Sequence, residues 1–263
     1  MKTVLEFAQA KHAQRKISMV TCYDYTFANL LNQTDVDCLL VGDSLGMTMH
    51  GYKNTIPVTM PMMVLHTKAV CAGAPQKFVV ADLPFLAFRK SLANGVEATQ
   101  KLIQAGAHAV KLEGARGNLK LVAHLVESGV PVMGHLGLTP QSVNGFGGFH
   151  VQAKEQEEQK QLMQDAIDLE KAGCFAIVLE CVPTKIATAI SQKLTIPTIG
   201  IGAGVGCDGQ VLVLQDLLGM NPSFKPKFVK HFMNGFQEMK TAFNTFHQDV
   251  VAEKFPTAKE SYE

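Results

Sequence analysis

The 263-residue sequence has little of what marks nucleic-acid-binding, membrane or disulfide-linked proteins. Its 24 basic and 23 acidic residues give a net charge of +1. No basic run stands out, which argues against a nucleic acid partner because phosphate binding needs clustered Lys and Arg. No apolar stretch reaches the roughly 20 residues of a membrane span, and the N-terminal segment lacks the apolar core of a signal peptide. We therefore expect a cytoplasmic protein that binds neither nucleic acid nor membranes.

The six cysteines are spread over the chain without a CxxC pair. Several stand inside apolar runs, which is typical of reduced core residues and not of disulfides or a zinc site. No segment rich in Pro and Ser separates domains. No GxGxxG motif follows the first predicted strand, which disfavours a dinucleotide-binding Rossmann domain.

What the sequence does contain is a series of short apolar runs that end in a charged or polar side chain. Such runs predict parallel strands that are buried on both faces. The five clearest are Leu39–Ser44, Phe78–Leu83, Ala109–Gly114, Pro131–His135 and Ala176–Cys181. Three further predicted strands are Ile17–Cys22, Ile196–Ile201 and Val211–Leu214. Because a charge at the end of a buried strand is costly unless the ends share a site, the pattern indicates an enzyme.

Helical patterns alternate with these strands. The predicted helices are Tyr25–Gln33, Pro61–Ala72, Leu92–Ala105, Asn118–Glu127, Glu155–Ala172, Pro183–Lys193 and Lys227–Phe246. Three of them end in a glycine that shortly precedes a strand, at Gly106, Gly129 and Gly173, as left-handed C-caps do. Eight alternating β and α segments favour a closed parallel barrel. We therefore predict one (β/α)8 TIM barrel domain over residues 1–263, with an amphipathic helix within Met1–Lys16 capping the barrel bottom.

Three carboxylates, Asp43, Asp82 and Glu113, follow predicted neighbouring strands. Carboxylates drawn together raise one another's pKa unless a cation lies between them, and oxygen ligands suit Mg²⁺. The alternative is that each Asp caps the helix after it. Ser44 offers a hydroxyl and a backbone N–H to an anion at the same turn. The pattern favours a magnesium site formed by Asp43, Asp82 and Glu113.

Lys111, Glu180 and His135 are the other candidate side chains. Lys111 stands two residues before Glu113, so both point to the same face of a strand. There the lysine would hold an anionic carboxylate or enolate, and a plain Lys–Glu ion pair is the alternative. Glu180 stands between apolar neighbours, and apolar surroundings would raise its pKa toward that of a general base. His135 would orient the substrate or relay protons, or else be structural.

Two glycine-rich segments leave alternatives open. Gly200–Gly204, after the seventh predicted strand, is similar to the phosphate-binding loops of many barrels. Small residues are equally expected where backbone crowds the barrel mouth. Phe146–Phe149 combines glycine hinges with aromatic side chains, as a lid does.

Several segments together resemble the ketopantoate hydroxymethyltransferase family. They are Tyr23–Asp24, Val41–Met47, Pro57–Thr59, Ala81–Phe85, Val110–Gly114, Gly134–Gln141, Leu179–Pro183 and Ile199–Gly204. The resemblance implies a Mg²⁺-dependent barrel of the phosphoenolpyruvate/pyruvate superfamily. It also implies 5,10-methylenetetrahydrofolate as co-substrate and a homo-oligomer, often a decamer. Phe88–Lys90 and Val151–Lys154 depart from the family pattern, and both lie in predicted mouth loops.

The resemblance implies an activity. A hydroxymethyl group would be transferred to 3-methyl-2-oxobutanoate by way of a Mg-bound enolate, giving 2-dehydropantoate for pantothenate biosynthesis. Metal ligation falls to Asp43 and Asp82 with Glu113 close by, and proton abstraction to Glu180. The implied contacts of the 2-oxo acid are Asp43, Ser44, Asp82 and Lys111. The alternatives are a related barrel lyase or mutase that acts on 2-oxo acids without folate, and a non-catalytic barrel that binds a 2-oxo acid and metal.

Overall fold

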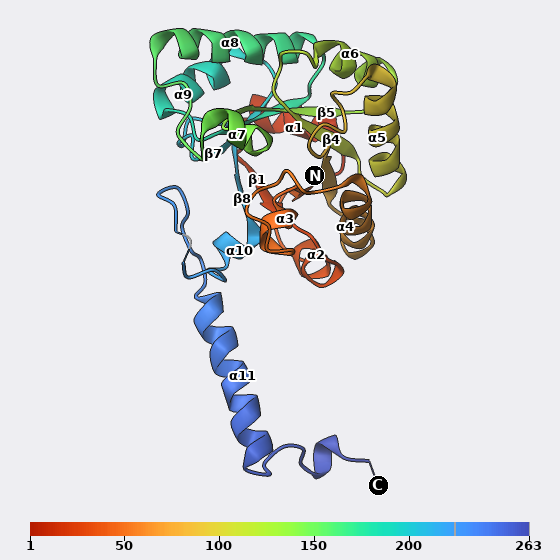
Figure 1. Ribbon diagram of the computed structural model, residues 1–263, viewed down its shortest axis with the longest axis vertical. Coiled ribbons are helices and arrows are strands. Elements are labelled where there is room, and N and C mark those ends of the chain that lie inside the picture. Colours follow the sequence, from red (N-terminus) through yellow and green to blue (C-terminus); the bar gives the residue numbers. More distant parts are fainter. Residues whose placement is uncertain (224, 263) are drawn as a thin grey trace. The chain divides into compact units, whose positions relative to one another are not determined.

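Eight parallel strands close into a barrel in which each strand pairs with the next and β8 pairs with β1 (Figure 1). The computed structural model describes residues 1–223 and 225–262. The strands are β1 (Ile17–Thr21), β2 (Cys38–Val41), β3 (Phe78–Asp82), β4 (Ala109–Glu113), β5 (Val132–Gly137), β6 (Ala176–Glu180), β7 (Thr198–Ile201) and β8 (Gly209–Leu212). The prediction of a (β/α)8 barrel is confirmed.

The predicted eighth strand was placed two residues too far along the chain. Its first residue is Gly209, which pairs with Ile17 of β1. A Cβ on Gly209 would lie 2.5 Å from the carbonyl oxygen of Ile17, so only glycine fits this close approach. Because glycine has no apolar side chain, the run of apolar residues did not include Gly209, and the predicted strand began too late.

Helices pack around the barrel and, in the case of α1, across its amino-terminal end (Figure 1). They are α1 (Val4–His12), α2 (Tyr25–Asn32), α3 (Leu45–Thr48), α4 (Met60–Gly73), α5 (Leu92–Gln104), α6 (Leu119–Glu127), α7 (Val143–Phe146), α8 (Gln156–Lys171) and α9 (Thr184–Lys193), with a 3₁₀ turn η1 (Pro140–Ser142). The predicted helices between residues 25 and 193 are confirmed to within one residue at either end. Gly106, Gly129 and Gly173 have φ angles of 107°, 85° and 101°, as expected of left-handed C-caps.

Local side chains define where helices begin. The Asp24 carboxylate accepts the backbone N–H of Phe27 at 2.9 Å and caps α2. Ser91 caps α5 in the same way, by accepting the N–H of Asn94 at 3.1 Å. Such caps contribute about 1 kcal/mol each.

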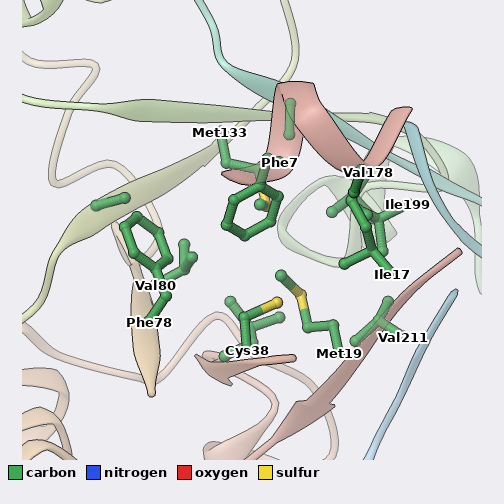
Figure 2. Close-up of a cluster of buried hydrophobic side chains, with 14 residues drawn as sticks. Phe7, Ile17, Met19, Cys38, Phe78, Val80, Met133, Val178, Ile199 and Val211 are labelled. Carbon is green, nitrogen blue, oxygen red and sulfur yellow. The ribbon is translucent and has the colours of Figure 1, made fainter. Parts of the chain in front are cut away.

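An apolar cluster fills the amino-terminal end of the barrel (Figure 2). Phe7 of α1 is fully buried, and its ring meets those of Phe78 and Phe175 edge to face at 5.3 Å and 5.1 Å. The side chains labelled around them are Ile17, Met19, Cys38, Val80, Met133, Val178, Ile199 and Val211. The predicted capping of the barrel bottom by the N-terminal helix is therefore confirmed. All six cysteines are free thiols, as predicted.

Asp37 connects the start of β2 to β1 and to the segment after α1. Its Oδ2 accepts the backbone N–H of Ser18 at 2.8 Å, and its Oδ1 pairs with Arg15 Nη1 at 2.9 Å. Burial raises the pKa of Asp37, but these hydrogen bonds outweigh burial and hold it below its usual value.

The described residues form two compact units, one over Met1–Val213 and the other from Leu214 onward, over residues 214–223 and 225–262. The second contains α10 (Leu214–Leu217), α11 (Gly235–Val251) and η2 (Ala258–Glu260). The helix predicted over Lys227–Phe246 begins eight residues later, because Phe232 and Gly235 donate their N–H groups to the carbonyls of Leu217 and Leu218. The assignment of the whole chain to one domain stays a prediction. None of the described helices is long and apolar enough to cross a membrane.

Candidate active site

Five titratable side chains are buried at the carboxyl ends of β2 to β5. They are Asp43, Asp82, Lys111, Glu113 and His135, and none is more than 4% exposed. Burying so many charges costs free energy unless they are paired or serve a bound group. The sequence predicted that these strand ends converge, and the structure brings all five side chains into one connected group.

Asp43 and Asp82 are held by each other and by a glutamine. The backbone N–H of Asp43 donates to Asp82 Oδ2 at 3.0 Å, and Gln141 Nε2 donates to Asp43 Oδ2 at 2.8 Å. Neither carboxylate caps a helix: the N-cap residue of α3 is Ser44, and the N-cap residue of α5, the next helix after Asp82, is Ser91. The helix-capping alternative is therefore wrong for both aspartates.

Lys111 is the cation at the centre of this group. Its Nζ lies 3.0 Å from Asp82 Oδ1 and 3.2 Å from His135 Nδ1. Within residues 1–223 and 225–262, no ion pair joins it to Glu113, so the plain Lys–Glu pair is wrong. Burial lowers the pKa of Lys111, but the charges of Asp82, Glu113 and Asp43 outweigh burial and raise it to about 12. Lys111 is therefore positively charged near neutral pH.

The carboxylates lack enough positive charge from the protein alone. Burial raises the pKa of Asp43 well above its usual range, and the charges of Asp82 and Glu113 raise it further. Burial also raises the pKa of Asp82, although Lys111 opposes it. Two buried oxygens, Asp82 Oδ1 and Glu113 Oε1, accept no hydrogen bond of good geometry, although each has a cationic or imidazole nitrogen nearby. An additional cation would remove this cost.

The oxygen donors fit Mg²⁺, which binds through one or two carboxylates and keeps several waters. In the part of the chain that the structure describes, no group of three or more His, Cys, Asp and Glu side chains is arranged around one point. Glu113 is held by the same glutamine as Asp43, since its Oε2 accepts the backbone N–H of Gln141 at 3.0 Å. The arrangement fits a metal held by Asp43 and Asp82 whose remaining ligands are water or substrate.

His135 connects Glu113 to Glu180. Its Nε2 lies 3.1 Å from Glu180 Oε2, and its Nδ1 lies 3.4 Å from Glu113 Oε1 and 3.2 Å from Lys111 Nζ. A neutral ring that accepts from Lys111 at Nδ1 must carry its proton on Nε2 and donate it to Glu180. Burial and Lys111 lower the pKa of His135, but its bonds to Glu113 and Glu180 outweigh them and raise it.

The expectation of apolar surroundings for Glu180 is wrong. Leu179 is fully buried, but residues that follow each other on a strand point to opposite faces. Glu180 shares its face with His135, and 18% of its side chain is exposed. The residues next to Glu180 in the sequence therefore do not indicate what surrounds its carboxylate.

Two residues of the site were quoted only within family motifs and were given no role from the sequence. The first is Tyr23, which is fully buried and whose hydroxyl lies 2.8 Å from Ser44 Oγ. Burial raises the pKa of this phenol well above its usual value, so it stays neutral. The second is Gln141 of η1, whose Nε2 also donates to the carbonyl of Leu83 at 2.9 Å. Because both neighbours of Nε2 are acceptors, the amide has a single possible orientation.

The glycine segments near the mouth are explained in part. A Cβ on Gly204 would lie 2.4 Å from Thr184 Cγ2, and one on Gly200 would lie 3.0 Å from Cys207 Sγ. Crowding by neighbouring side chains therefore accounts for these two positions without a bound phosphate. In the segment Phe146–Phe149, Gly147 and Gly148 have φ angles of 68° and 131°. The lid function of that segment stays a prediction.

The closed barrel and its buried charged group define the class of the protein, a (β/α)8-barrel enzyme. Its fold is similar to that of phosphonopyruvate hydrolase in a crystal structure with oxalate and Mg++, with a TM-score of 0.67 and 11% identity over 99% of this chain and 93% of that chain. It is also similar to 2,3-dimethylmalate lyase, a PEP mutase/isocitrate lyase superfamily member, with a TM-score of 0.63 and 13% identity over 100% and 92%.

Sequence comparison identifies the family. The model of the ketopantoate hydroxymethyltransferase family matches residues 1–258, and the chain belongs to this family. The 3-methyl-2-oxobutanoate hydroxymethyltransferase of Bdellovibrio bacteriovorus is 60% identical over 262 residues, with full coverage of both chains. The enzyme of the same name from Coxiella burnetii is 53% identical over 252 residues, which cover 95% of each chain. The protein is thus an enzyme of a hydroxymethyltransferase family.

Proposed function

We propose that the protein transfers the one-carbon unit of 5,10-methylenetetrahydrofolate to 3-methyl-2-oxobutanoate and forms 2-dehydropantoate for pantothenate biosynthesis. Similarity to enzymes of that name along the whole chain supports the reaction. The observation that carries the proposal is the buried group in which Lys111 lies between the aspartates and the His135–Glu180 pair. It offers a cation for an anionic substrate next to a candidate base.

Asp43 and Asp82 are the proposed ligands of Mg²⁺, with Glu113 near it or bound through water. Their raised pKa values and the oxygen-only donor set support this assignment. A bound ion supplies positive charge that stabilises the negative charge developing on the keto oxygen of the substrate. The bond from Gln141 Nε2 to Oδ2 of Asp43 fixes the orientation of this carboxylate.

The remaining residues bind the 2-oxo acid and move its proton. Lys111 and the Ser44 hydroxyl, itself held by Tyr23, contact the anionic substrate. Glu180 removes the proton from C3, and the electron pair of the broken C–H bond moves toward the keto oxygen to give an enolate. His135 holds the Glu180 carboxylate in position through its Nε2.

The enolate carbon then forms the new C–C bond to the one-carbon unit of the folate. Both C–N bonds of the methylene bridge break: the new C–C bond replaces one, and the C–O bond of a water-derived hydroxyl replaces the other. The proton taken from C3 and one proton of the water pass to the two folate nitrogens, and tetrahydrofolate is released with 2-dehydropantoate. Folate thus carries the one-carbon chemistry, and the protein supplies position and charge.

One assay tests this function. Purified enzyme is incubated with 3-methyl-2-oxobutanoate, methylenetetrahydrofolate and Mg²⁺, and 2-dehydropantoate is measured by mass spectrometry. We expect product only when all three are present. Consumption of the 2-oxo acid without folate would instead favour a lyase or mutase. Binding without any turnover would favour a non-catalytic barrel. The homo-oligomer of decameric size remains part of the proposal, and sedimentation of the purified chain tests it.

A further inference from the structure

Arg89 lies in the loop after β3 and reaches across the end of β4. Its Nη2 donates to the backbone carbonyl of Glu113 at 3.1 Å, and its Nη1 donates to that of Arg116 at 3.0 Å. A Cβ on Gly114 would lie 3.1 Å from Nη2, and one on Gly117 would lie 3.4 Å from Nη1. Side chains at these two positions would crowd the guanidinium. The two glycines and the two carbonyl groups, of Glu113 and Arg116, therefore form a binding position for Arg89.

The charge of Arg89 is not neutralised by the protein. Across the described ranges 1–223 and 225–262, no carboxylate oxygen lies within 4.0 Å of its guanidinium nitrogens. Its two carbonyl partners are neutral, and its third neighbour is the ring of Phe88, 5.5 Å from Cζ. An arginine fixed by neutral groups keeps N–H donors and a full charge for an anion.

A small cavity opens beside this guanidinium. Its volume is about 40 Å³, and its lining residues are Phe85, Leu86, Phe88, Glu113, Gln141 and Ser142 together with Arg89. A cavity of this size holds a small polar group such as one carboxylate, but no larger part of a substrate. Around it, the side chains of Phe85 and Leu86 are 36% and 42% exposed. An apolar surface therefore borders a recess lined by the Arg89 guanidinium and by Glu113, whose Oε2 is already bound by the backbone N–H of Gln141.

The place where Arg89 contacts the end of β4 indicates which anion it binds. Its carbonyl partner on Glu113 lies two residues beyond Lys111, or about 7 Å further out at the rise of a strand. The 2-oxo acid has one carboxylate and only a short carbon chain. When this substrate is held at Lys111, its one carboxylate is already bound, and Arg89 is left without an anion. The second cation needs a second anion, carried by a longer molecule that extends out of the barrel.

We propose that Arg89 binds a glutamate carboxylate of the folate co-substrate, whose p-aminobenzoyl ring lies against Phe85 and Leu86. The inference rests on the proposed function, because it takes folate as the second substrate. An aromatic ring next to an acidic tail matches the exposed apolar side chains next to the unpaired guanidinium. The one-carbon unit, which bridges the pterin and the nitrogen of the p-aminobenzoyl group, then lies on the inner side of that ring, toward Lys111 and Glu180.

The test compares Arg89→Ala with Lys90→Ala. Lys90 is exposed, carries the same charge and is the next residue. Its removal therefore lowers the positive charge at the barrel mouth by the same amount but leaves the contacts of Arg89 with Glu113 and Arg116 unchanged. Tetrahydrofolate binding is titrated first without 2-oxo acid. We expect Arg89→Ala to raise the Kd about tenfold, as for loss of one charge-assisted hydrogen bond, and Lys90→Ala to change it little. In turnover, the KM for folate should rise in Arg89→Ala while the KM for the 2-oxo acid stays near that of the wild type.

A second measurement needs no variant. Against the folate substrate of the unaltered enzyme, p-aminobenzoylglutamate should inhibit at least about tenfold better than p-aminobenzamide, which lacks the glutamate. Equal inhibition by the two compounds, or an unchanged Kd in Arg89→Ala, overturns the proposal. A rise of the 2-oxo acid KM alone assigns Arg89 to the small substrate and also overturns it. A failure of the proposed function looks different: folate binding would still depend on Arg89 while no 2-dehydropantoate forms.

Discussion

Replacement of Glu180 by glutamine separates proton abstraction from binding. The substitution keeps the shape of the side chain and removes its capacity to accept a proton. General-base catalysis contributes about 10²–10⁴-fold, which corresponds to about 2.7–5.4 kcal/mol of barrier. If Glu180 is the base, the rate of proton loss from C3 should fall by that factor in Glu180→Gln.

The contacts of Glu180 explain why binding should survive the change. Its hydrogen-bond partner is His135 Nε2 at 3.1 Å, and the amide oxygen of glutamine can accept that same bond. The substrate carboxylate is assigned to Lys111, which lies on β4 and is held by Asp82. The affinity for 3-methyl-2-oxobutanoate should therefore change little, although the loss of the Glu180 charge lowers the pKa of His135.

The assay follows hydrogen exchange at C3 of 3-methyl-2-oxobutanoate by NMR in D₂O, with Mg²⁺ and without folate. Exchange without folate is expected because enolate formation precedes the folate step. Glu157→Gln is the matched control, since Glu157 is an exposed residue of α8 that pairs with Lys160. Wild-type exchange in Glu180→Gln would refute the reasoning, and His135 would then be the next candidate base.

Three further predictions follow from contacts in the barrel. Asp43→Ala should abolish turnover and weaken Mg²⁺ binding, measured by calorimetry, while circular dichroism stays unchanged; full activity after EDTA treatment would contradict the metal site. Lys111→Ala should raise the KM for the 2-oxo acid more than that for folate, and equal rises would indicate a structural role. Asp37→Asn should cost about 1 kcal/mol of unfolding free energy at pH 7, because it weakens the bonds from Ser18 and Arg15. The folded-state pKa of Asp37 is depressed, so this stability is present above about pH 4 and is lost as pH falls through the folded pKa. Urea unfolding that shows the same difference at pH 7 and at strongly acid pH would contradict it.

The sequence predicted what depends on order along the chain. Apolar runs locate buried strands, and a parallel barrel brings the residues after those runs to one end, so the meeting of Asp43, Asp82 and Glu113 could be predicted. Gln141 could not, because it reaches Asp43 from a 3₁₀ turn 98 residues away and belongs to no strand. Its contact depends on the path of a loop, which periodicity does not encode.

Burial was also hard to predict one residue at a time. Tyr23 follows β1 and reads like any residue of a turn, yet its ring is fully buried and its hydroxyl meets Ser44. Glu180 was judged by its neighbours on the strand, which face the other side of the sheet. The residues that share its environment come from β5, the adjacent strand.

The apolar cluster around Phe7, at the amino-terminal end of the barrel, affects the order in which substrates bind. Because α1 fills the amino-terminal end of the barrel, both substrates arrive by the same route, from the carboxyl ends of the strands. A small acid seated at Lys111 lies deeper than a folate held at Arg89. In the proposed reaction the acid would then have to enter first, and 2-dehydropantoate would have to leave last, after tetrahydrofolate. A folate that arrives early blocks the way for the acid, so an excess of folate should slow the enzyme.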